Sequence, residues 1–264
     1  MLVDIALSKL PVTELAGGPR FAFSIHKCGS TLMHSMIRAV CTRAEIPAIS
    51  IPDLMFSNGI LDPQWAADEA LLPAFRRNIL YFGFRHLPDI LTAPDFDLRA
   101  RRFVLLVRDP RDALVSQYFS YGKKSGSHAI PAKNAEEFRK RLEAAGDRLI
   151  DEYVLAASRN LHKKFEAYRD NLDFSKGLLR RYEDVFFDKE TFLAEIFDHF
   201  KISVHRTIIA EVARDNDVRP EKEDETKHIR KGTPGDHAEK LQPATIATLN
   251  ERFREVGAFY GYSL

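Results

Sequence analysis

Five consecutive residues near the N-terminus, Lys27-Cys28-Gly29-Ser30-Thr31, have the composition of an anion-binding turn. Gly29 lets the backbone approach an anion closely. Ser30 and Thr31 can donate hydrogen bonds through their hydroxyl groups, and Lys27 supplies a full positive charge. We interpret Cys28 as a small residue that fits the turn, with a reactive thiol as the less favoured alternative. The stretch therefore predicts a site for an anionic group.

The residues on either side of this turn predict the two elements that position it. Residues 21–26 are mostly apolar and β-forming, which predicts a buried strand. From Thr31 to Cys41, apolar residues recur at helical spacing, which predicts a helix with one buried face. The turn then directs backbone N–H groups and the positive end of the helix dipole at one point. It is not a Walker A loop, because Lys27 precedes the only glycine.

A second predicted strand, residues 78–85, leads directly to a histidine. Pro88 ends the strand region and disfavours helical geometry at Leu87, so His86 lies at a strand end or in a loop. Ligands of open α/β sheets bind beyond the carboxyl ends of the strands, where the 27–31 turn is also expected. We therefore interpret His86 as a candidate general base, with a structural histidine as the alternative.

A third predicted strand, residues 102–107, is apolar beyond its first residue, as is typical of the centre of a parallel sheet. Asp109 suits the N-cap and Pro110 the first position of the helix that follows, which we expect to reach residue 121. Arg108 precedes this helix, and Ser116 lies within two turns of it. A guanidinium fork and a hydroxyl match the geometry of a phosphate group. The alternative is a surface arginine paired with local acids.

Four segments in chain order, KCGST, RDPRDALVSQY, RRYED and RKGTPGD, together with the HLP sequence at His86, resemble the motifs of sulfotransferases. These are the enzymes that use 3′-phosphoadenosine 5′-phosphosulfate (PAPS). The resemblance implies an α/β, P-loop-like fold of three layers, in which helices flank a central parallel sheet. The length of 264 residues suits one such domain over residues 1–264, with a further strand expected at 178–182 and helices in between.

The resemblance also implies which residues bind the nucleotide and which act in catalysis. The implied nucleotide-binding residues are Lys27, Cys28, Gly29, Ser30, Thr31, Leu32, Arg108, Ser116, Tyr182, Arg230, Lys231 and Gly232. Among them, Arg108, Ser116 and residues 230–232 correspond to the family's 3′-phosphate site, and Tyr182 borders the nucleotide. The implied catalytic residues are His86, Lys27 and Ser116. Leu32 stands where family members often carry a tryptophan that stacks on adenine.

The implied reaction is transfer of a sulfuryl group from PAPS to an acceptor, with adenosine 3′,5′-bisphosphate as the second product. By analogy with phosphoryl transfer, positioning and charge stabilisation dominate the catalysis. His86 is expected to take a proton from an acceptor hydroxyl, and Lys27 to stabilise the oxygen that leaves with the 5′-phosphate. Ser116 is expected to restrain Lys27 until the acceptor binds. No metal is expected to be needed.

Composition restricts the partners. A net charge of +1 argues against a protein that coats nucleic acid, and no apolar stretch is long enough for a membrane span. Two cysteines, expected to be free thiols, favour a reducing, cytoplasmic setting. The expected acceptor is a small molecule, a glycan or a lipid with an alcohol, phenol or sugar hydroxyl. No pattern in the sequence defines an oligomeric state.

Two polar segments are expected near the ligand: an irregular, partly ordered loop over residues 45–73 and a lid over residues 214–236 that the nucleotide orders. Trp65, Phe56 and Met55 in the first could line an acceptor pocket or simply pack. Two other functions are compatible with the motifs. One is a P-loop kinase or nucleotidyl transferase, which would need ATP and Mg²⁺. The other is a nucleotide-binding protein without sulfotransferase activity.

Overall fold

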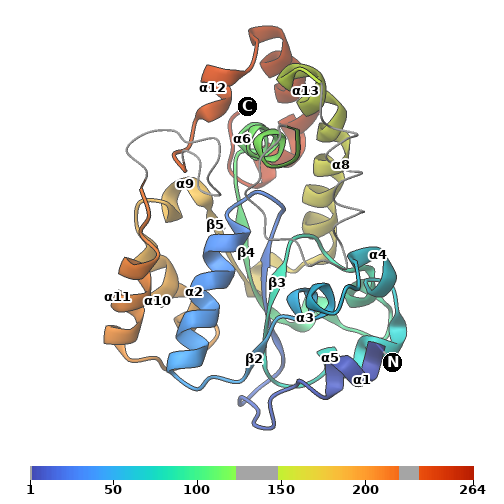
Figure 1. Ribbon diagram of the computed structural model, residues 1–264, viewed down its shortest axis with the longest axis vertical. Helices are drawn as coiled ribbons and strands as arrows, with labels where there is room; N and C mark the ends of the chain where they lie inside the picture. Colours follow the sequence, from blue (N-terminus) through green and yellow to red (C-terminus); the bar gives the residue numbers. More distant parts are fainter. Residues whose placement is uncertain (1, 123–147, 220–231) are drawn as a thin grey trace.

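The computed structural model describes residues 2–122, 148–219 and 232–264, and at its centre lies a five-stranded sheet (Figure 1). The strand order is β2-β3-β1-β4-β5, and every neighbouring pair is parallel. The strands are β1 (Arg20–Ser24), β2 (Ala48–Ile49), β3 (Leu80–Phe84), β4 (Arg102–Val107) and β5 (Gly177–Arg181). The predicted central parallel sheet is therefore confirmed. Because β1 is central, the chain crosses from one side of it to the other, as in doubly wound folds.

The strand pattern in the sequence located four of these strands to within two residues. The predicted strand 102–107 coincides with β4, and β5 begins one residue before the predicted range. In β1 the apolar side chains alternate between the two faces of the sheet, with Phe21 and Phe23 on one side and Ala22 on the other. Strand β2, with only two residues at the edge of the sheet, carried too little apolar pattern to be predicted.

Helices cover both faces of the sheet and complete three layers (Figure 1). One face packs against α2 (Ser30–Arg43), α10 (Lys189–His199) and α11 (Arg206–Asp215). The opposite face packs mainly against α8 (Ile150–Asn171) and α13 (Pro243–Phe259), which contact each other, and against α6 (Pro110–Gln117). Alternating residues of each strand point to opposite faces of the sheet and pack into two separate apolar cores, one on each face.

The remaining described elements are short. They are α1 (Leu2–Leu7), α3 (Ile51–Ser57), α4 (Asp62–Trp65), η1 (Glu69–Leu71), α5 (Leu72–Phe75), η2 (Asp89–Thr92), η3 (Leu98–Ala100), η4 (Tyr118–Gly122), η6 (Phe174–Lys176), α9 (Tyr182–Val185) and α12 (Asp236–Lys240). Within the described ranges, no helix combines the length and the apolar character that crossing a membrane requires.

The expectation of an irregular loop over residues 45–73 was wrong. This stretch contains β2, the short helices α3 and α4, and the beginning of α5. Local capping explains the difference, because the Ser50 hydroxyl accepts a hydrogen bond from the Asp53 amide at 3.2 Å and Pro52 occupies the first turn of α3. Trp65 and Met55 are fully buried in the core, so ordinary packing is their role, whereas Phe56 is 40% exposed.

A β-bulge in β3 changes the direction of the chain just before His86. The pairing of β1 with β3 runs from Phe21–Tyr81 to Phe23–Phe84, so β3 carries one extra residue. Gly83 lies in this bulge with φ +96°, and a Cβ atom there would come within 1.9 Å of Ser50 Oγ. Only glycine adopts this φ angle without strain and also leaves room for the Ser50 side chain. The bulge thereby sets where the segment that follows, with Arg85 and His86, leaves the sheet.

Candidate active site

The segments that follow four parallel strands meet at one edge of the sheet, as the sequence predicted. The 25–29 turn follows β1, His86 follows β3, Arg108 follows β4 and Tyr182 follows β5. Contacts between these segments are close. The Arg108 guanidinium lies 4.6 Å from the centre of the Tyr182 ring, and a Cβ atom on Gly29 would be 2.5 Å from the same ring. The structure therefore brings four of the predicted segments together.

The turn after β1 has the backbone geometry of a built anion site. Lys27 and Gly29 both have positive φ angles, +65° and +89°, and Ser30 begins α2 directly afterwards. A positive φ at a lysine is uncommon and is typical of a constrained functional turn. Burial raises the pKa of the fully buried Cys28 thiol well above its usual value, which favours the small, inert residue over the reactive thiol.

The other residues of the predicted phosphosulfate loop lie in the first turn of α2. The Ser30 side chain is buried, Thr31 is exposed, and Leu32 is half-buried against the core beneath α2. Cys28 and Cys41 are separate free thiols. A 14-residue helix thus begins at the turn, so its dipole and its first N–H groups point toward the place where an anion would lie.

Lys27 is held by a serine, but not by the serine that the resemblance indicated. Its Nζ donates to Ser120 Oγ at 2.5 Å, and the Ser120 hydroxyl donates to the Ser116 carbonyl at 3.0 Å. The reason lies in the helix: α6 ends at Gln117 and continues as the π-helical turn η4, which shifts the side-chain positions that follow. In this structure the hydrogen-bond partner of the Lys27 ammonium is thus Ser120.

The Lys27 ammonium lies in a strongly positive environment. Burial, followed by the charges of Arg108 and Arg85, lowers the pKa of Lys27 to about 8. Arg85 and Arg108 thus lie near enough for their charges to repel that of Lys27. A group with two or more negative charges would relieve this repulsion and would raise the Lys27 pKa again.

His86 lies at the end of β3 with a carboxylate beside it. Its Nδ1 is 3.5 Å from Asp62 Oδ2, and the His86 side chain is 26% exposed. Burial lowers the pKa of His86, a shift that the carboxylate of Asp62 opposes. Near neutral pH the imidazole is therefore mostly uncharged, which is the form that can accept a proton.

Arg108 is the buried cation of the site. It is 7% exposed, its guanidinium stacks on Tyr182, and Nη2 lies 3.5 Å from Asp112 Oδ2. Among the described residues, the buried Nε of Arg108 has no hydrogen-bond partner. A buried guanidinium N–H without an acceptor is costly, so this atom is a donor available to a ligand.

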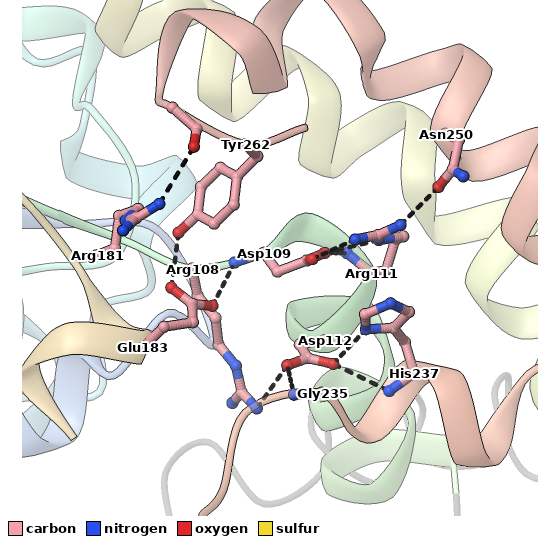
Figure 2. Close-up of polar contacts among 11 residues, drawn as sticks. Arg108, Asp109, Arg111, Asp112, Arg181, Glu183, Gly235, His237, Asn250 and Tyr262 are labelled. Carbon is pink, nitrogen blue, oxygen red and sulfur yellow. Dashed lines mark hydrogen bonds and ion pairs between the residues drawn. The ribbon is translucent and has the colours of Figure 1, made fainter. Parts of the chain in front are cut away.

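Asp112 joins this site to the C-terminal part of the chain (Figure 2). Its carboxylate accepts hydrogen bonds from the Gly235 amide at 2.7 Å and the His237 amide at 2.9 Å. His237 Nδ1 lies 2.7 Å from the same carboxylate and donates to it. The predicted N-cap of α6 is confirmed, because Asp109 Oδ1 accepts a hydrogen bond from the Arg111 amide at 2.9 Å. The pattern of one segment could not reveal partners more than 120 residues away.

A second set of contacts fixes the backbone around Arg108 (Figure 2). Glu183 accepts hydrogen bonds from the Asp109 amide at 2.9 Å and from the Tyr262 hydroxyl at 2.8 Å. Arg111 binds both Asp109, through an ion pair of 2.6 Å, and Asn250 of α13 at 2.8 Å. Three segments distant in sequence therefore support the start of α6. Glu183 and Tyr262 were not identified as site residues from the sequence.

Tyr182 occupies the predicted position at the end of β5 and contacts the predicted clamp segment. Its hydroxyl donates to the Gly232 carbonyl at 2.8 Å. Arg230 and Lys231 lie outside the described residues. Within the described ranges, no group of three or more histidine, cysteine, aspartate or glutamate side chains is placed to hold a metal ion.

The fold and the site together define an α/β protein whose cationic candidate residues Lys27 and Arg108 lie at the carboxyl edge of a parallel sheet. A family model described as "Sulfotransferase domain" matches residues 21–258, so the chain belongs to the sulfotransferase family. This match confirms the family that the sequence motifs indicated. No curated protein sequence matches the chain.

Solved structures show the same fold at low sequence identity. The chain is similar to mouse sulfotransferase SULT7A1 complexed with PAP, with a TM-score of 0.59 and 15% identity over 97% of this chain and 90% of that chain. It is also similar to retinol dehydratase in a complex with retinol and PAP, with a TM-score of 0.51 and 16% identity over 100% of this chain and 86% of that chain. These similarities confirm the predicted sulfotransferase fold.

Proposed function

We propose that this chain transfers the sulfuryl group of PAPS to an acceptor hydroxyl. The observation that carries the proposal is the pair of cationic positions at the sheet edge: Lys27 in the anion-binding turn and the buried Arg108 with its unpartnered Nε. PAPS carries anionic groups at two corresponding places, the 5′-phosphosulfate and the 3′-phosphate. Both solved structures described above contain PAP, the bisphosphate product, which supports the same nucleotide here.

In the proposed reaction, the acceptor oxygen attacks the sulfur atom in line with the bond that breaks. The hydroxyl proton moves to the neutral imidazole of His86, and a new bond forms between the acceptor oxygen and sulfur. The bond between sulfur and the bridging oxygen of the 5′-phosphate breaks, and its electron pair stays with the nucleotide. Lys27 stabilises the negative charge that develops there, and the loop N–H groups act with it.

The hydrogen bond from Lys27 to Ser120 supports a lysine that changes its hydrogen-bond partner when the donor nucleotide binds. The ammonium binds a neutral hydroxyl, an acceptor weaker than a phosphate oxygen, so a bound phosphosulfate can draw it away. Ser116 and Ser120 lie on the same face of the helical segment after Arg108, and we assign the lysine restraint to Ser120. Arg108, together with Ser116 and residues 230–232, is assigned to the 3′-phosphate.

We propose a small-molecule acceptor with a hydroxyl group, which a histidine base suits. The retinol in one of the similar structures is an alcohol and supports this class. We also propose one sulfotransferase domain over residues 1–264 and a reducing, cytoplasmic setting, which the two buried free thiols support. A glycan or lipid hydroxyl remains within the same chemistry.

Titration of the nucleotide tests the donor. We expect Mg²⁺-independent binding of adenosine 3′,5′-bisphosphate to the wild type, and weaker binding by about 1.5 to 3 kcal/mol in Arg108→Ala. ADP and ATP, with and without Mg²⁺, serve as the comparison ligands. Binding of ATP with Mg²⁺ in place of the bisphosphate would favour the P-loop kinase. Bisphosphate binding without transfer to any hydroxyl acceptor, in wild type and His86→Ala alike, would favour the non-catalytic nucleotide-binding protein.

A further inference from the structure

Asp112 is a buried carboxylate that contacts two separate segments, Arg108 before its own helix and residues 235–237. Its side chain is 1% exposed and accepts from the Gly235 amide, the His237 amide and the His237 imidazole, at 2.7, 2.9 and 2.7 Å. Its Oδ2, which accepts from the Gly235 amide, also lies 3.5 Å from Arg108 Nη2. Burial by itself raises the pKa of Asp112, but the hydrogen bonds from His237, the charge of Arg108 and the Gly235 amide hold it far below its usual range. The carboxylate therefore stays ionised and acts only as an acceptor.

The segment from Gly232 to His237 is fastened at both ends to the residues that hold Arg108. At one end, the Tyr182 hydroxyl donates to the Gly232 carbonyl, and the Tyr182 ring stacks under the guanidinium. At the other end, Asp112 binds both Gly235 and His237 (Figure 2). Arg108 thus lies between two anchors, and each anchor also holds the 232–237 segment. A shift of this segment would change the surroundings of the guanidinium.

The charges explain why Arg108 needs such a partner. Burial lowers the pKa of the Lys27 ammonium, and the charge of the Arg108 guanidinium lowers it further, so the two cations repel each other. Asp112 is the carboxylate that forms an ion pair with Arg108, and it approaches Nη2, while Nε of Arg108 has no acceptor among the described residues. One side of the guanidinium is therefore fixed by protein, and the other retains a donor for a ligand.

We propose that Asp112 is a positioning residue that gives the site its selectivity for a nucleotide with a 3′-phosphate, an inference that rests on the proposed function. It holds Arg108 and residues 232–237 in one arrangement around the place of that phosphate. Gly235 has φ +91°, and no atom lies within 4 Å of a Cβ built on it, so glycine is required there for its backbone conformation rather than for space. That conformation turns its amide and the His237 amide toward one carboxylate.

Two ligands that differ only in the 3′-phosphate test the proposal. Adenosine 3′,5′-bisphosphate and adenosine 5′-monophosphate are titrated into the wild type and into Asp112→Asn. The amide keeps the shape of the side chain but removes its charge and places an N–H group against donors. We expect the bisphosphate affinity to fall roughly 10- to 100-fold and the monophosphate affinity to change less than about 3-fold. Asp188→Asn is the matched control, because Asp188 accepts from the Thr191 amide as the N-cap of α10 and asparagine caps equally well.

A second pair of variants decides the matter if Asp112→Asn does not fold. His237→Ala removes one donor to Asp112, whereas the side-chain amide of His237→Asn can replace the imidazole Nδ1 as donor. We expect His237→Ala to lose bisphosphate affinity selectively and His237→Asn to recover most of it. Equal losses for both nucleotides, or no loss, would overturn the positioning role. A wild type that does not prefer the bisphosphate over the monophosphate would instead overturn the proposed function.

Discussion

The two ends of the candidate nucleotide site are built differently. The turn that we assign to the transferred group consists of neighbouring residues, 25–29, between β1 and α2, and its cation Lys27 donates to one neutral hydroxyl at 2.5 Å. The end that we assign to the 3′-phosphate is built from residues far apart in sequence. Its cation Arg108 is buried between the Tyr182 ring and the Asp112 carboxylate.

We propose that this difference separates recognition of the nucleotide, at Arg108, from the transfer chemistry, at Lys27. A guanidinium fixed on two sides loses little freedom when it binds a phosphate, so it suits recognition of a constant group. An ammonium on a neutral partner can move as charge develops on the leaving oxygen, which suits a reacting group. The predictions that follow test this contrast, from the largest expected effect to the smallest.

His86→Ala should have the largest effect, and only at the transfer end. Loss of the proton acceptor is expected to lower turnover roughly 10²- to 10⁴-fold while the affinity for adenosine 3′,5′-bisphosphate stays within about 2-fold. Steady-state rates and nucleotide titration measure the two quantities. His205→Asn is the control, since this exposed histidine caps α11 far from the site. An equal loss of nucleotide affinity would assign His86 to binding rather than catalysis.

Lys27→Met should lower turnover about 10²- to 10³-fold and, at the same time, stabilise the nucleotide-free protein. The pKa of Lys27 is about 8 in the folded chain, against an ordinary lysine value of 10.5, so the unfolded chain binds more protons between these pH values. Wild-type stability should therefore rise as the pH increases from about 8 to 10.5, and the variant should lose this pH dependence. At pH 7 the gain in the variant is expected to be about 1–3 kcal/mol.

Denaturant unfolding of wild type and Lys27→Met at pH 7 and pH 10 measures this contribution. Lys176→Met, at an exposed lysine beside Asp173, is the matched control and should show no such dependence. A variant that is less stable than the wild type at pH 7 would mean that the Ser120 contact outweighs the burial of the charge.

Arg108→Lys should weaken the bisphosphate by about 1–3 kcal/mol with a smaller effect on turnover at saturating donor. Lysine keeps the charge but cannot present the planar fork or stack on Tyr182 in the same way. The measurement is the ratio of bisphosphate to monophosphate affinity, with Arg180→Lys as the control at an arginine that pairs with Glu195 at 2.7 Å. A large loss of turnover with unchanged bisphosphate affinity would assign Arg108 to the transfer of the sulfuryl group rather than to recognition of the 3′-phosphate.

Ser120→Ala should have the smallest effect, a change in turnover of about 0.5–1.5 kcal/mol in activation free energy. The direction of the change shows whether the Ser120 hydroxyl restrains Lys27. If the hydroxyl holds Lys27 back, donor hydrolysis in the absence of acceptor should increase in the variant. Ser116→Ala tests the residue that the sequence resemblance indicated, and Ser175→Ala serves as the surface control. A larger change in Ser116→Ala than in Ser120→Ala would contradict the restraint assigned from the structure.

Local sequence patterns predicted the elements whose formation depends on residues close together in the chain. Strands β1, β3, β4 and β5 follow from short apolar runs, and the start of α6 follows from Asp109 and Pro110, because capping and strand formation depend on neighbours in the chain. The prediction for residues 45–73 was wrong because α3 and α4 are too short to show a helical period. The cap at Ser50 and the burial of Trp65 and Met55 became clear only in the structure.

The sequence by itself determined the family and the common edge at which the candidate residues meet, since parallel strands place their carboxyl ends together and the motif order is a property of the chain. Only the tertiary structure decided which serine binds Lys27 and which residues hold Arg108. The π-helical turn after α6 contains Ser120, which accepts a hydrogen bond from Lys27, and the folding of the C-terminal part brought Gly235 and His237 to Asp112. Such contacts depend on distances between segments far apart in the chain, and no local pattern encodes those distances.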